Sequence, residues 1–453
     1  MKMELSNIQR VYLVGIGGIG MSGLARYFNH IGCIVCGYDK TPTDLTDSLR
    51  NEGIQIVFED YADAIPKSFR DVDPNTLIIY TPAIPHDSAI LNFFQRKGFT
   101  LYKRSQVLGI ISKGKYTIAV AGTHGKTTTS TMVAHILKDS GIDCSAFLGG
   151  ISTNYETNVL FGSSDIVVVE ADEYDRSFLT LHPDIAIITS MDADHLDIYG
   201  DHAHLTDSFK QFASQIKMGG VLIRKKGLPL DKGFTYSIDG DAEATATNIR
   251  IENGDFYFDF VRGSITIANI QMGIAGLHNI ENAVAAIEAA LRLHVDHDHI
   301  KSALGSFKGV KRRFEYIVKN DTHIYIDDYA HHPEELRAAI TSIKRLYPGK
   351  KLTTIFQPHL YTRTRDFADG FAEVLDMSDE LIMLDIYPAR ELPIEGVNAD
   401  MILERMKLAD RHKYGKQEAI DKVRLEKPEL LLTVGAGDID QLVHPLKQAL
   451  EDV

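Results

Sequence analysis

Residues 113–141 read KGKYTIAVAGTHGKTTTSTMVAHILKDSG, an apolar strand followed by a glycine loop and a long helix. The loop places Gly125, Lys126 and Thr127 between strand and helix, where backbone N–H groups, an ammonium group and a hydroxyl can hold phosphates and magnesium. The strict form of this loop has glycine five positions before Gly125, where this chain has Val120. The run of threonine and serine at the start of the helix has no packing reason, so we expect the loop to bind ATP.

Strands and helices alternate on both sides of this loop. The strand segments are VYLVG, CIVCGYD, QIVFED and TLIIYTPAIP before it, DIVVVE and DIAIITS after it, and THIYIDD, KLTTIFQPH, DELIMLDIYP and ELLLTVGAG in the last third. Such alternation predicts an α/β fold with parallel sheets, whereas the glycine-punctuated stretch around 245–273 is typical of β-hairpins. We expect three domains: a Rossmann-like domain at 1–110, a central P-loop ATPase-like domain at 111–320 and a second Rossmann-like domain at 321–453.

Length and charge exclude several classes of protein. A chain of 453 residues exceeds the roughly 250 to 300 residues that one core usually serves. The net charge of −14 argues against a nucleic-acid binder or a membrane-surface binder, because either needs a basic face. No run approaches the roughly 20 apolar residues of a membrane span, and the N-terminus leads into VYLVG without the apolar core of a signal peptide. We expect a cytoplasmic protein with small-molecule substrates, without membrane insertion.

Two cysteines form a C-x-x-C pattern in the apolar run IGCIVCGYD. Because alternate residues of a strand point to opposite faces, Cys33 and Cys36 diverge. With Cys144 alone elsewhere, we interpret all three as buried thiols rather than a zinc or redox site.

A second glycine motif follows the first strand. Gly15, Gly17 and Gly20 spell G-x-G-x-x-G before a helix, and Asp39 lies near the end of the next strand, as in dinucleotide-binding folds. The glycines let the backbone approach a diphosphate, and the helix N-terminus opposes its charge. The residues alone leave open which nucleotide binds, and a tight turn without a ligand is the alternative.

Acidic residues follow the strands that come after the phosphate loop. Glu170 ends VVVE, and Asp192, Asp194 and His195 follow AIITS, so a parallel sheet would bring them beside the loop. We expect Glu170 and His195 to hold magnesium. For Asp172, Asp175 and Asp192 we favour turn and cap roles.

Six motifs occur in order along the whole chain. They are GTHGKTT at 122–128, EADE at 170–173, DADHLD at 192–197, GLHN at 276–279, DDYAHHP at 327–333 and FQPHxYTRT at 356–364. Together they resemble the motifs of the Mur ligases, and the run GIGGIGMSGLA at 15–25 is similar to that of the alanine-adding branch. The resemblance implies a three-domain enzyme of peptidoglycan precursor synthesis, in which ATP and Mg²⁺ drive ligation of L-alanine to the lactyl carboxylate of UDP-N-acetylmuramate through an acyl phosphate.

The resemblance also implies the site residues. Around the uridine diphosphate it implies Gly17, Gly18, Ile19, Gly20, Met21, Ser22, Asp39, Thr81 and Ala83. Around ATP it implies Gly122, Thr123, His124, Gly125, Lys126, Thr127, Thr128, Asn279, Asn282, Arg313 and Asp328. The implied metal ligands are Thr127, Glu170 and His195, and the implied catalytic residues are Lys126, His195, His331, His359 and Arg363.

Some residues depart from the family pattern or carry weaker signals. Leu360 stands where many relatives have arginine, so that contact is not carried over. Lys210 lies on an amphipathic pattern, where we expect an exposed lysine rather than a metal-site residue. HVDHDHI at 294–300 is interpreted as a solvated turn, and Arg390 as a candidate substrate contact.

Three other functions stay open at this point. The first is an amide ligase that acts on murein tripeptide. The second is an NAD-dependent dehydrogenase, which the first glycine motif alone would suggest. The third is a nucleotide sensor that closes on ATP without catalysis.

Overall fold

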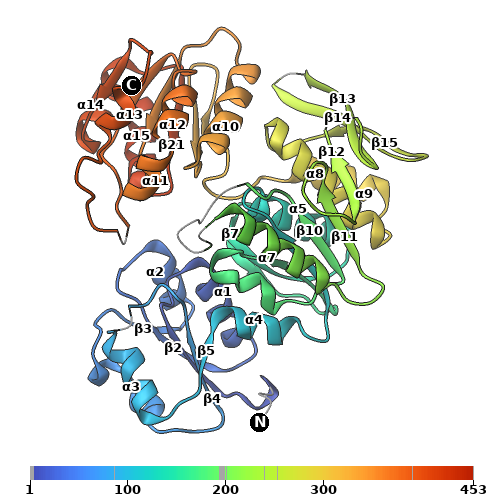
Figure 1. Cartoon of the computed structure of the whole chain (residues 1–453), viewed down its shortest axis with the longest axis vertical. Coiled ribbons are helices and arrows are strands. Elements are labelled where there is room, and N and C mark those ends of the chain that lie inside the picture. The colour runs from blue at the N-terminus through green and yellow to red at the C-terminus, as the bar shows by residue number, and fades with distance from the viewer. Residues whose placement is uncertain are drawn as a thin grey trace. The chain divides into compact units, whose positions relative to one another are not determined.

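Three sheets organise the chain, one in each of the predicted α/β stretches (Figure 1). The computed structural model describes residues 5–85, 87–192, 199, 201–238, 240–252, 254–389 and 391–451, without the side chain of Asp175. The α/β fold class is confirmed. Among the described residues, no helix is both long enough and apolar enough to cross a membrane.

The first sheet has the order β3-β2-β1-β4-β5, and its paired strands are parallel. Its strands are β1 (Arg10–Val14), β2 (Ile34–Tyr38), β3 (Gln55–Val57), β4 (Thr76–Tyr80) and β5 (Leu101–Lys103). Its helices are α1 (Ile19–His30), α2 (Asp44–Asn51), α3 (Ala89–Lys97) and α4 (Arg104–Ser112), with short 3₁₀ turns at η1 (Leu5–Asn7), η2 (Ala62–Ala64) and η3 (Lys67–Phe69). The strand order runs outward from β1 to β3 on one side and from β4 to β5 on the other, so the direction of strand connection switches between β1 and β4. Ligands of open α/β sheets bind at the carboxyl ends of the strands at such a switch point.

The cysteines follow the prediction. Cys33 packs in one buried cluster with Val11 and Leu13, whereas Cys36 packs in another with Tyr12 and Val14. All three cysteines are buried and unbridged, and burial raises the pKa of the Cys36 thiol to about 11. Raised pKa values keep thiols protonated and inert, which confirms their interpretation as buried thiols.

The second sheet contains the phosphate loop and has the order β15-β14-β13-β12-β11-β10-β6-β9-β7-β8. Its strands are β6 (Tyr116–Ala121), β7 (Ser145–Ser152), β8 (Thr157–Leu160), β9 (Ile166–Glu170), β10 (Ile185–Ile188), β11 (Val221–Lys225), β12 (Phe234–Ser237), β13 (Ala244–Glu252), β14 (Asp255–Arg262) and β15 (Ile265–Gln271). The accompanying helices are α5 (Lys126–Asp139), η4 (Tyr174–Thr180), α7 (His202–Ser214), α8 (Leu277–Arg292) and α9 (His297–Ser306). Because β6 lies parallel between β9 and β10, the carboxyl ends of these three strands meet at one edge.

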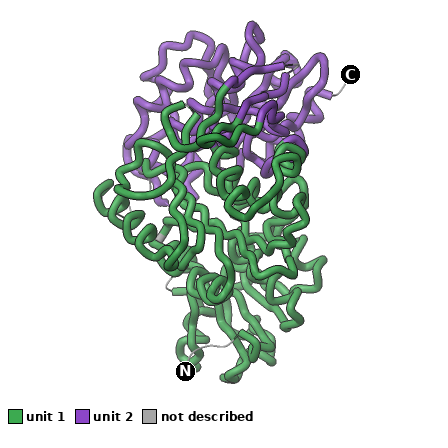
Figure 2. The backbone as a smooth tube through the Cα atoms, turned by 90° about the vertical axis from the view of Figure 1, so that its right-hand side faces the viewer, with its two compact units in different colours: residues 1–247, 260–267, 282–304 green, residues 248–259, 268–281, 305–453 purple. Residues whose placement is uncertain are grey.

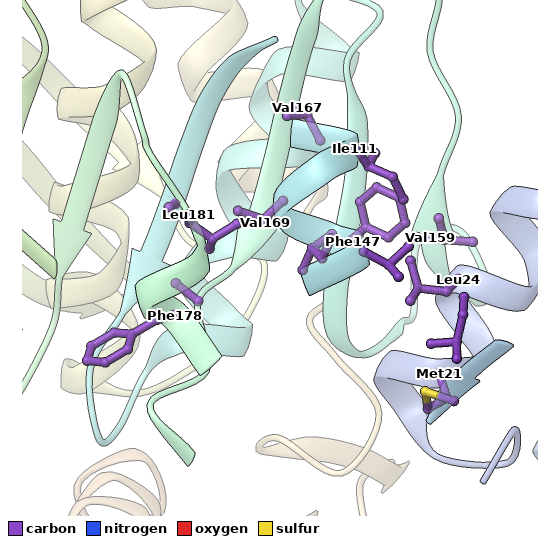
Figure 3. Close-up of a cluster of buried hydrophobic side chains, with 14 of the residues drawn as sticks. Met21, Leu24, Ile111, Phe147, Val159, Val167, Val169, Phe178 and Leu181 are labelled. Atoms are coloured by element: carbon purple, nitrogen blue, oxygen red, sulfur yellow. The ribbon is translucent and has the colours of Figure 1, made fainter. Parts of the chain in front are cut away.

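One buried apolar cluster joins the first and second sheets. Met21 and Leu24 of α1 belong to the same cluster as Phe147 of β7, Val159 of β8 and Ile111 of α4 (Figure 3). Burying one such side chain contributes about 1.5–3 kcal/mol to stability. The helix that follows the first glycine motif is therefore held against β7 and β8.

The third sheet has the order β16-β17-β21-β18-β19-β20, in which β16 and β17 pair antiparallel. Its strands are β16 (Glu315–Lys319), β17 (Ile324–Asp328), β18 (Leu352–Phe356), β19 (Glu380–Met383), β20 (Arg411–Lys413) and β21 (Leu430–Val434). Its helices are α10 (Pro333–Leu346), α11 (Tyr361–Asp366), α12 (Ala368–Leu375), α13 (Asp400–Leu403), α14 (Lys416–Glu426), η5 (Asp438–Leu442) and α15 (Val443–Glu451). The central strands β17, β21 and β18 are buried along their whole length, as strands covered on both faces must be.

By its internal contacts the chain divides into two compact units (Figure 2). Unit 1 contains residues 1–247, 260–267 and 282–304, and unit 2 contains residues 248–259, 268–281 and 305–453. The boundaries near 110 and 320 stay predictions.

Candidate active site

The first glycine motif lies at the switch point of the first sheet. Gly17 donates its backbone N–H to Oδ2 of Asp39 at 2.8 Å, so the structure brings the predicted acidic residue to the loop. Helix α1 begins at Ile19, and its N-cap residue Gly18 has no side-chain capping bond. The first N–H groups of an α-helix have no intrahelical acceptor, so this end of α1 is suited to an anion.

A cleft of about 220 Å³ begins at this loop and reaches the second sheet. Its walls include Gly18, Ile19, Gly20, Met21 and Thr81 from the first sheet's side, and Gly149, Asn158, Glu170 and Asp172 from the second sheet's side. Of the other residues predicted around the uridine diphosphate, Ala83 is exposed and does not line the cleft. Ser22 is buried, and its hydroxyl donates to the carbonyl oxygen of Ile19 at 2.8 Å.

The phosphate loop connects β6 to α5, and polar side chains support it. The backbone N–H of His124 donates to Oγ of Ser190 at 2.7 Å, and the hydroxyls of Thr123 and Ser190 lie 2.9 Å apart. A Cβ atom on Gly125 would lie 2.7 Å from Oδ1 of Asn282, which is closer than side chains tolerate. The structure thus brings Asn282, predicted near the nucleotide, to the phosphate loop.

Lys126 lies at the start of α5 and is enclosed by acceptors. Its ammonium group donates to the carbonyl oxygen of Gly122 at 2.6 Å and to Oε1 of Glu173 at 2.9 Å. Burial alone would lower the pKa of Lys126, but the charges of Glu173, Glu170 and Asp172 together raise it. Lys126 therefore carries its positive charge at neutral pH, as a phosphate ligand must.

Of the predicted metal ligands, Glu170 and Thr127 are described. Glu170 ends β9, next to β6, and its carboxylate lies directly over Gly149 of β7. Thr127 and Thr128 are buried in the first turn of α5. His195 and Asp194 lie outside the described residues.

In unit 2, predicted residues gather at the carboxyl ends of β17 and β18. Asp328 ends β17 and accepts the backbone N–H groups of Phe314 and Ala330, each at 2.7 Å. Burial raises the pKa of Asp328 to about 6, although the charge of Arg313 opposes that shift. The Arg313 guanidinium lies 4.9 Å from the centre of the Tyr329 ring.

The predicted catalytic residues of unit 2 lie together. The rings of His331 and His359 are 5.9 Å apart, and Nη1 of Arg363 is 3.3 Å from Nδ1 of His359. His331 Nδ1 lies 2.9 Å from the carbonyl oxygen of Tyr329, and burial lowers the pKa of His331 to about 4. Asn279, which also belongs to unit 2, is buried and donates to the carbonyl oxygen of Ala275 at 2.5 Å.

Family models match three long parts of this chain. They are described as the Mur ligase family catalytic domain, the Mur ligase middle domain and the Mur ligase glutamate ligase domain, and they match residues 10–116, 120–290 and 312–437. A UDP-N-acetylmuramate–L-alanine ligase from Flavobacterium psychrophilum is 48% identical over 450 residues, which are 99% of this chain and 100% of the relative. The chain belongs to the Mur ligase family.

Solved structures of Mur ligases have the same fold. A UDP-N-acetylmuramate–alanine ligase from Thermotoga maritima superposes with a TM-score of 0.83 at 28% identity, over 96% of this chain and 98% of that one. A murein peptide ligase from Psychrobacter arcticus gives a TM-score of 0.70 at 23% identity, over 98% and 99% of the two chains, a likeness that shows the fold alone. The three-domain Mur ligase architecture is therefore confirmed, and the dehydrogenase suggested by the first glycine motif is excluded.

The structure adds three residues to this Mur ligase site that the sequence did not single out. They are Glu173, which pairs with Lys126, Arg104, which pairs with Asp172 at 3.1 Å, and Asn158, which lines the cleft. The sequence contained one signal for Asn158, because it is a polar residue directly before the apolar pair Val159 and Leu160 in the strand TNVL. Asp172 also accepts the backbone N–H of Tyr174, which agrees with the predicted turn role.

The weaker predictions are placed as follows. Lys210 is exposed and lies 3.5 Å from Asp207 on α7, as the amphipathic pattern predicts. In the histidine-rich stretch the polar residues are exposed, as predicted, but from His297 on the stretch forms the first turn of α9 rather than a loop, with Asp296 accepting the backbone N–H of Asp298. Arg390 lies outside the described residues.

Proposed function

We propose that this Mur ligase joins L-alanine to the lactyl carboxylate of UDP-N-acetylmuramate, with ATP converted to ADP and phosphate. The observation that carries the proposal is the cleft in unit 1, whose walls include both the glycine loop before α1 and Glu170. A nucleotide diphosphate at the loop would direct the sugar and its carboxylate toward the strand ends beside the phosphate loop. Full-length similarity to alanine-adding relatives supports the choice of substrates.

The donor set at the strand ends fits magnesium. The Glu170 carboxylate and the Thr127 hydroxyl are hard oxygen ligands, which this ion prefers, and His195 is the third ligand that the family resemblance implies. Magnesium, when bound, neutralises charge on the phosphate oxygens. The ammonium group of Lys126 lies in the same loop and contributes a fixed positive charge to the transferring phosphoryl group.

The reaction takes two steps. The lactyl carboxylate oxygen attacks the γ-phosphorus and displaces ADP, which gives an acyl phosphate. The amine of L-alanine then attacks the acyl carbon, and phosphate leaves as the amide forms. Electrostatic stabilisation of the oxygens that gain charge is usually the largest contribution to such catalysis.

In unit 2 we assign the amino acid to the cluster of His331, His359 and Arg363. Arg363 offers a guanidinium for the alanine carboxylate, since arginine matches carboxylate geometry in a bidentate way. With a pKa of about 4, His331 is neutral at pH 7 and can accept a proton or a hydrogen bond.

The experiment is a phosphate-release assay on the full chain with ATP, Mg²⁺, UDP-N-acetylmuramate and one amino acid at a time. We expect turnover with L-alanine, and weaker turnover with glycine or L-serine, because a pocket discriminates one methyl group by only about 1–3 kcal/mol. Turnover with murein tripeptide but not with alanine would overturn the proposal. A nucleotide sensor would give no carboxylate-dependent ADP with any amino acid.

A further inference from the structure

Asn158 of β8 is a fully buried amide that contacts the first turn of α1. Its Nδ2 donates to the carbonyl oxygen of Ile19 at 2.5 Å and to Oγ of Ser22 at 3.0 Å. Its Oδ1 accepts from Nη1 of Arg26 at 2.5 Å. The partners fix the orientation of the amide, because a carbonyl oxygen only accepts and a guanidinium only donates.

Arg26 is itself held in place. Its guanidinium bonds both carboxylate oxygens of Glu52, with the nearest contact at 2.7 Å, and donates to Oγ of Ser48 at 3.0 Å. Arginine and carboxylate in this bidentate arrangement define direction as well as distance. Arg26 belongs to α1 and is fixed against α2, so the oxygen side of the Asn158 amide contacts the middle of α1 and its nitrogen side holds the first turn of that helix.

The contact lies in a water-excluding apolar setting. Val159, the next residue, belongs to the buried cluster that also contains Leu24 and Phe147, and Figure 3 shows Leu24 beside Val159. A built Cβ on Gly23 would lie 3.5 Å from Nδ2 of Asn158, an ordinary contact, so the helix lies close to the strand. Hydrogen bonds in such surroundings are stronger than in water, and an unsatisfied partner costs more.

Asn158 also belongs to the sheet that carries Glu170. β8 pairs with β7, and β7 pairs with β9, which ends at Glu170. Ile19, Asn158 and Glu170 line the same cleft. The amide thus links the anion-binding end of α1 to the rigid sheet on which the proposed metal ligand lies.

We propose that Asn158 is a positioning residue for the nucleotide diphosphate of the substrate. By holding the carbonyl oxygen of Ile19 and the hydroxyl of Ser22, it orients the first N–H groups of α1 toward the cleft, at a fixed separation from Glu170. Ser22 then acts through Asn158 and Ile19 rather than by direct contact with the diphosphate. This inference rests on the proposed function, because it assigns the diphosphate of that substrate to α1.

The test compares Asn158→Ala and Asn158→Asp with the wild type. Both variants remove the donors to Ile19 and Ser22, and Asn158→Asp keeps an acceptor for Arg26. We expect the KM for UDP-N-acetylmuramate to rise about tenfold, while the KM values for ATP and L-alanine stay within about twofold. The matched control is Asn29→Ala. It removes a hydrogen bond that the Asn29 side-chain amide, near the other end of α1, donates to the carbonyl oxygen of Glu52. Its KM values should stay within about twofold of the wild type.

A binding measurement separates the inference from the proposed function. Calorimetric titration with UDP alone and with ADP alone should show weaker UDP binding in both Asn158 variants and unchanged ADP binding. If wild-type protein does not bind UDP, the proposed function fails. If the wild type binds UDP and both folded variants bind it equally well, the positioning role fails while the proposed function stands.

Melting midpoints decide which variant is compared. If Asn158→Ala melts below the assay temperature, Asn158→Asp is used, because it retains the partner of Arg26. Loss of folding in both variants would overturn the inference, since Asn158 would then support the whole fold rather than the loop.

Discussion

The ammonium group of Lys126 lies 2.9 Å from Oε1 of Glu173, and the Glu173 side chain is only 1% exposed. This ion pair joins the phosphate loop to the segment after β9, so a phosphate group that binds at the loop must compete with a carboxylate for the same cation. Removing one partner of a buried ion pair leaves the other charge uncompensated, which typically costs about 3–5 kcal/mol. Replacing both partners by neutral groups of similar size often costs little.

We therefore expect Lys126→Met to lower stability by about 3 kcal/mol and to reduce turnover by at least about 100-fold. The double variant Lys126→Met with Glu173→Gln should regain most of the stability, because no buried charge is left unpaired, but none of the turnover. Urea unfolding and phosphate release measure the two effects separately.

Lys113→Ala is the control for these variants, because Lys113 is exposed at the end of α4. Lys113→Ala should change neither the free energy of unfolding nor the turnover rate. Turnover of Lys126→Met within about tenfold of the wild type would contradict the role of Lys126 as a phosphate ligand.

A second prediction concerns Gly149, which lies under the Glu170 carboxylate. A methyl group at this position would overlap both carboxylate oxygens, so Gly149→Ala must displace Glu170. Because disturbing the support of a metal ligand typically costs 10- to 100-fold in affinity, the half-saturating Mg²⁺ concentration should rise about tenfold or more. Magnesium titrations of the initial rate measure it.

Gly305→Ala is the matched control, because Gly305 is exposed near the end of α9 and a Cβ there meets nothing closer than 4.0 Å. We expect it to leave the Mg²⁺ dependence unchanged. An unchanged Mg²⁺ dependence in a folded Gly149→Ala protein would argue against Glu170 as a ligand.

A third prediction concerns acid stability. Burial lowers the pKa of His331 from 6.5 to about 4, so folding favours the neutral imidazole. The stability that results is present above pH 6.5 and is lost as the pH falls toward 4, by up to about 3 kcal/mol. Asp328 acts in the opposite direction, because its raised pKa of about 6 contributes stability that is lost as the pH rises through that value.

His331→Gln isolates the histidine contribution, since glutamine can still donate to the carbonyl oxygen of Tyr329. Between pH 6.5 and 4 the unfolding free energy of the wild type should fall by up to about 3 kcal/mol more than that of the variant. His182→Gln, at an exposed position before β10, should follow the wild type. Parallel curves for wild type and His331→Gln would show that His331 does not lose its proton on folding.

The sequence predicted the parts of the site that are local in the chain. Asp39 was identified because strand, glycine turn, helix and acidic residue follow a fixed order, and the structure brings it to Gly17. Lys126 was identified from the glycine loop between a strand and a helix, and Glu170 from strand ends that must meet at one sheet edge. These inferences need only periodicity and the rules of parallel sheets.

The sequence did not predict the side-chain partners that tie distant segments together. Asn158 is 139 residues from Ile19, and Arg104 is 68 residues from Asp172. Such pairs depend on how α1 and α4 pack on the second sheet, which periodicity does not specify. Glu173 was missed for a different reason, because three acidic side chains stand within EADE and only the turn after β9 decides which one faces Lys126.

The last prediction separates two arginines on one short helix. Arg363 of α11 is buried and lies 3.3 Å from Nδ1 of His359, whereas Arg365, two residues later, is exposed and bonds its neighbour Asp366. Lysine keeps the charge at either position but loses the planar fork that matches a carboxylate. We expect Arg363→Lys to lower kcat/KM for L-alanine by about tenfold or more, with the KM for UDP-N-acetylmuramate unchanged, and Arg365→Lys to have no effect. Steady-state kinetics with each substrate varied in turn give the comparison. Equal effects of the two substitutions would place the alanine carboxylate away from Arg363. An effect on the KM for UDP-N-acetylmuramate alone would assign Arg363 to the binding of that substrate instead.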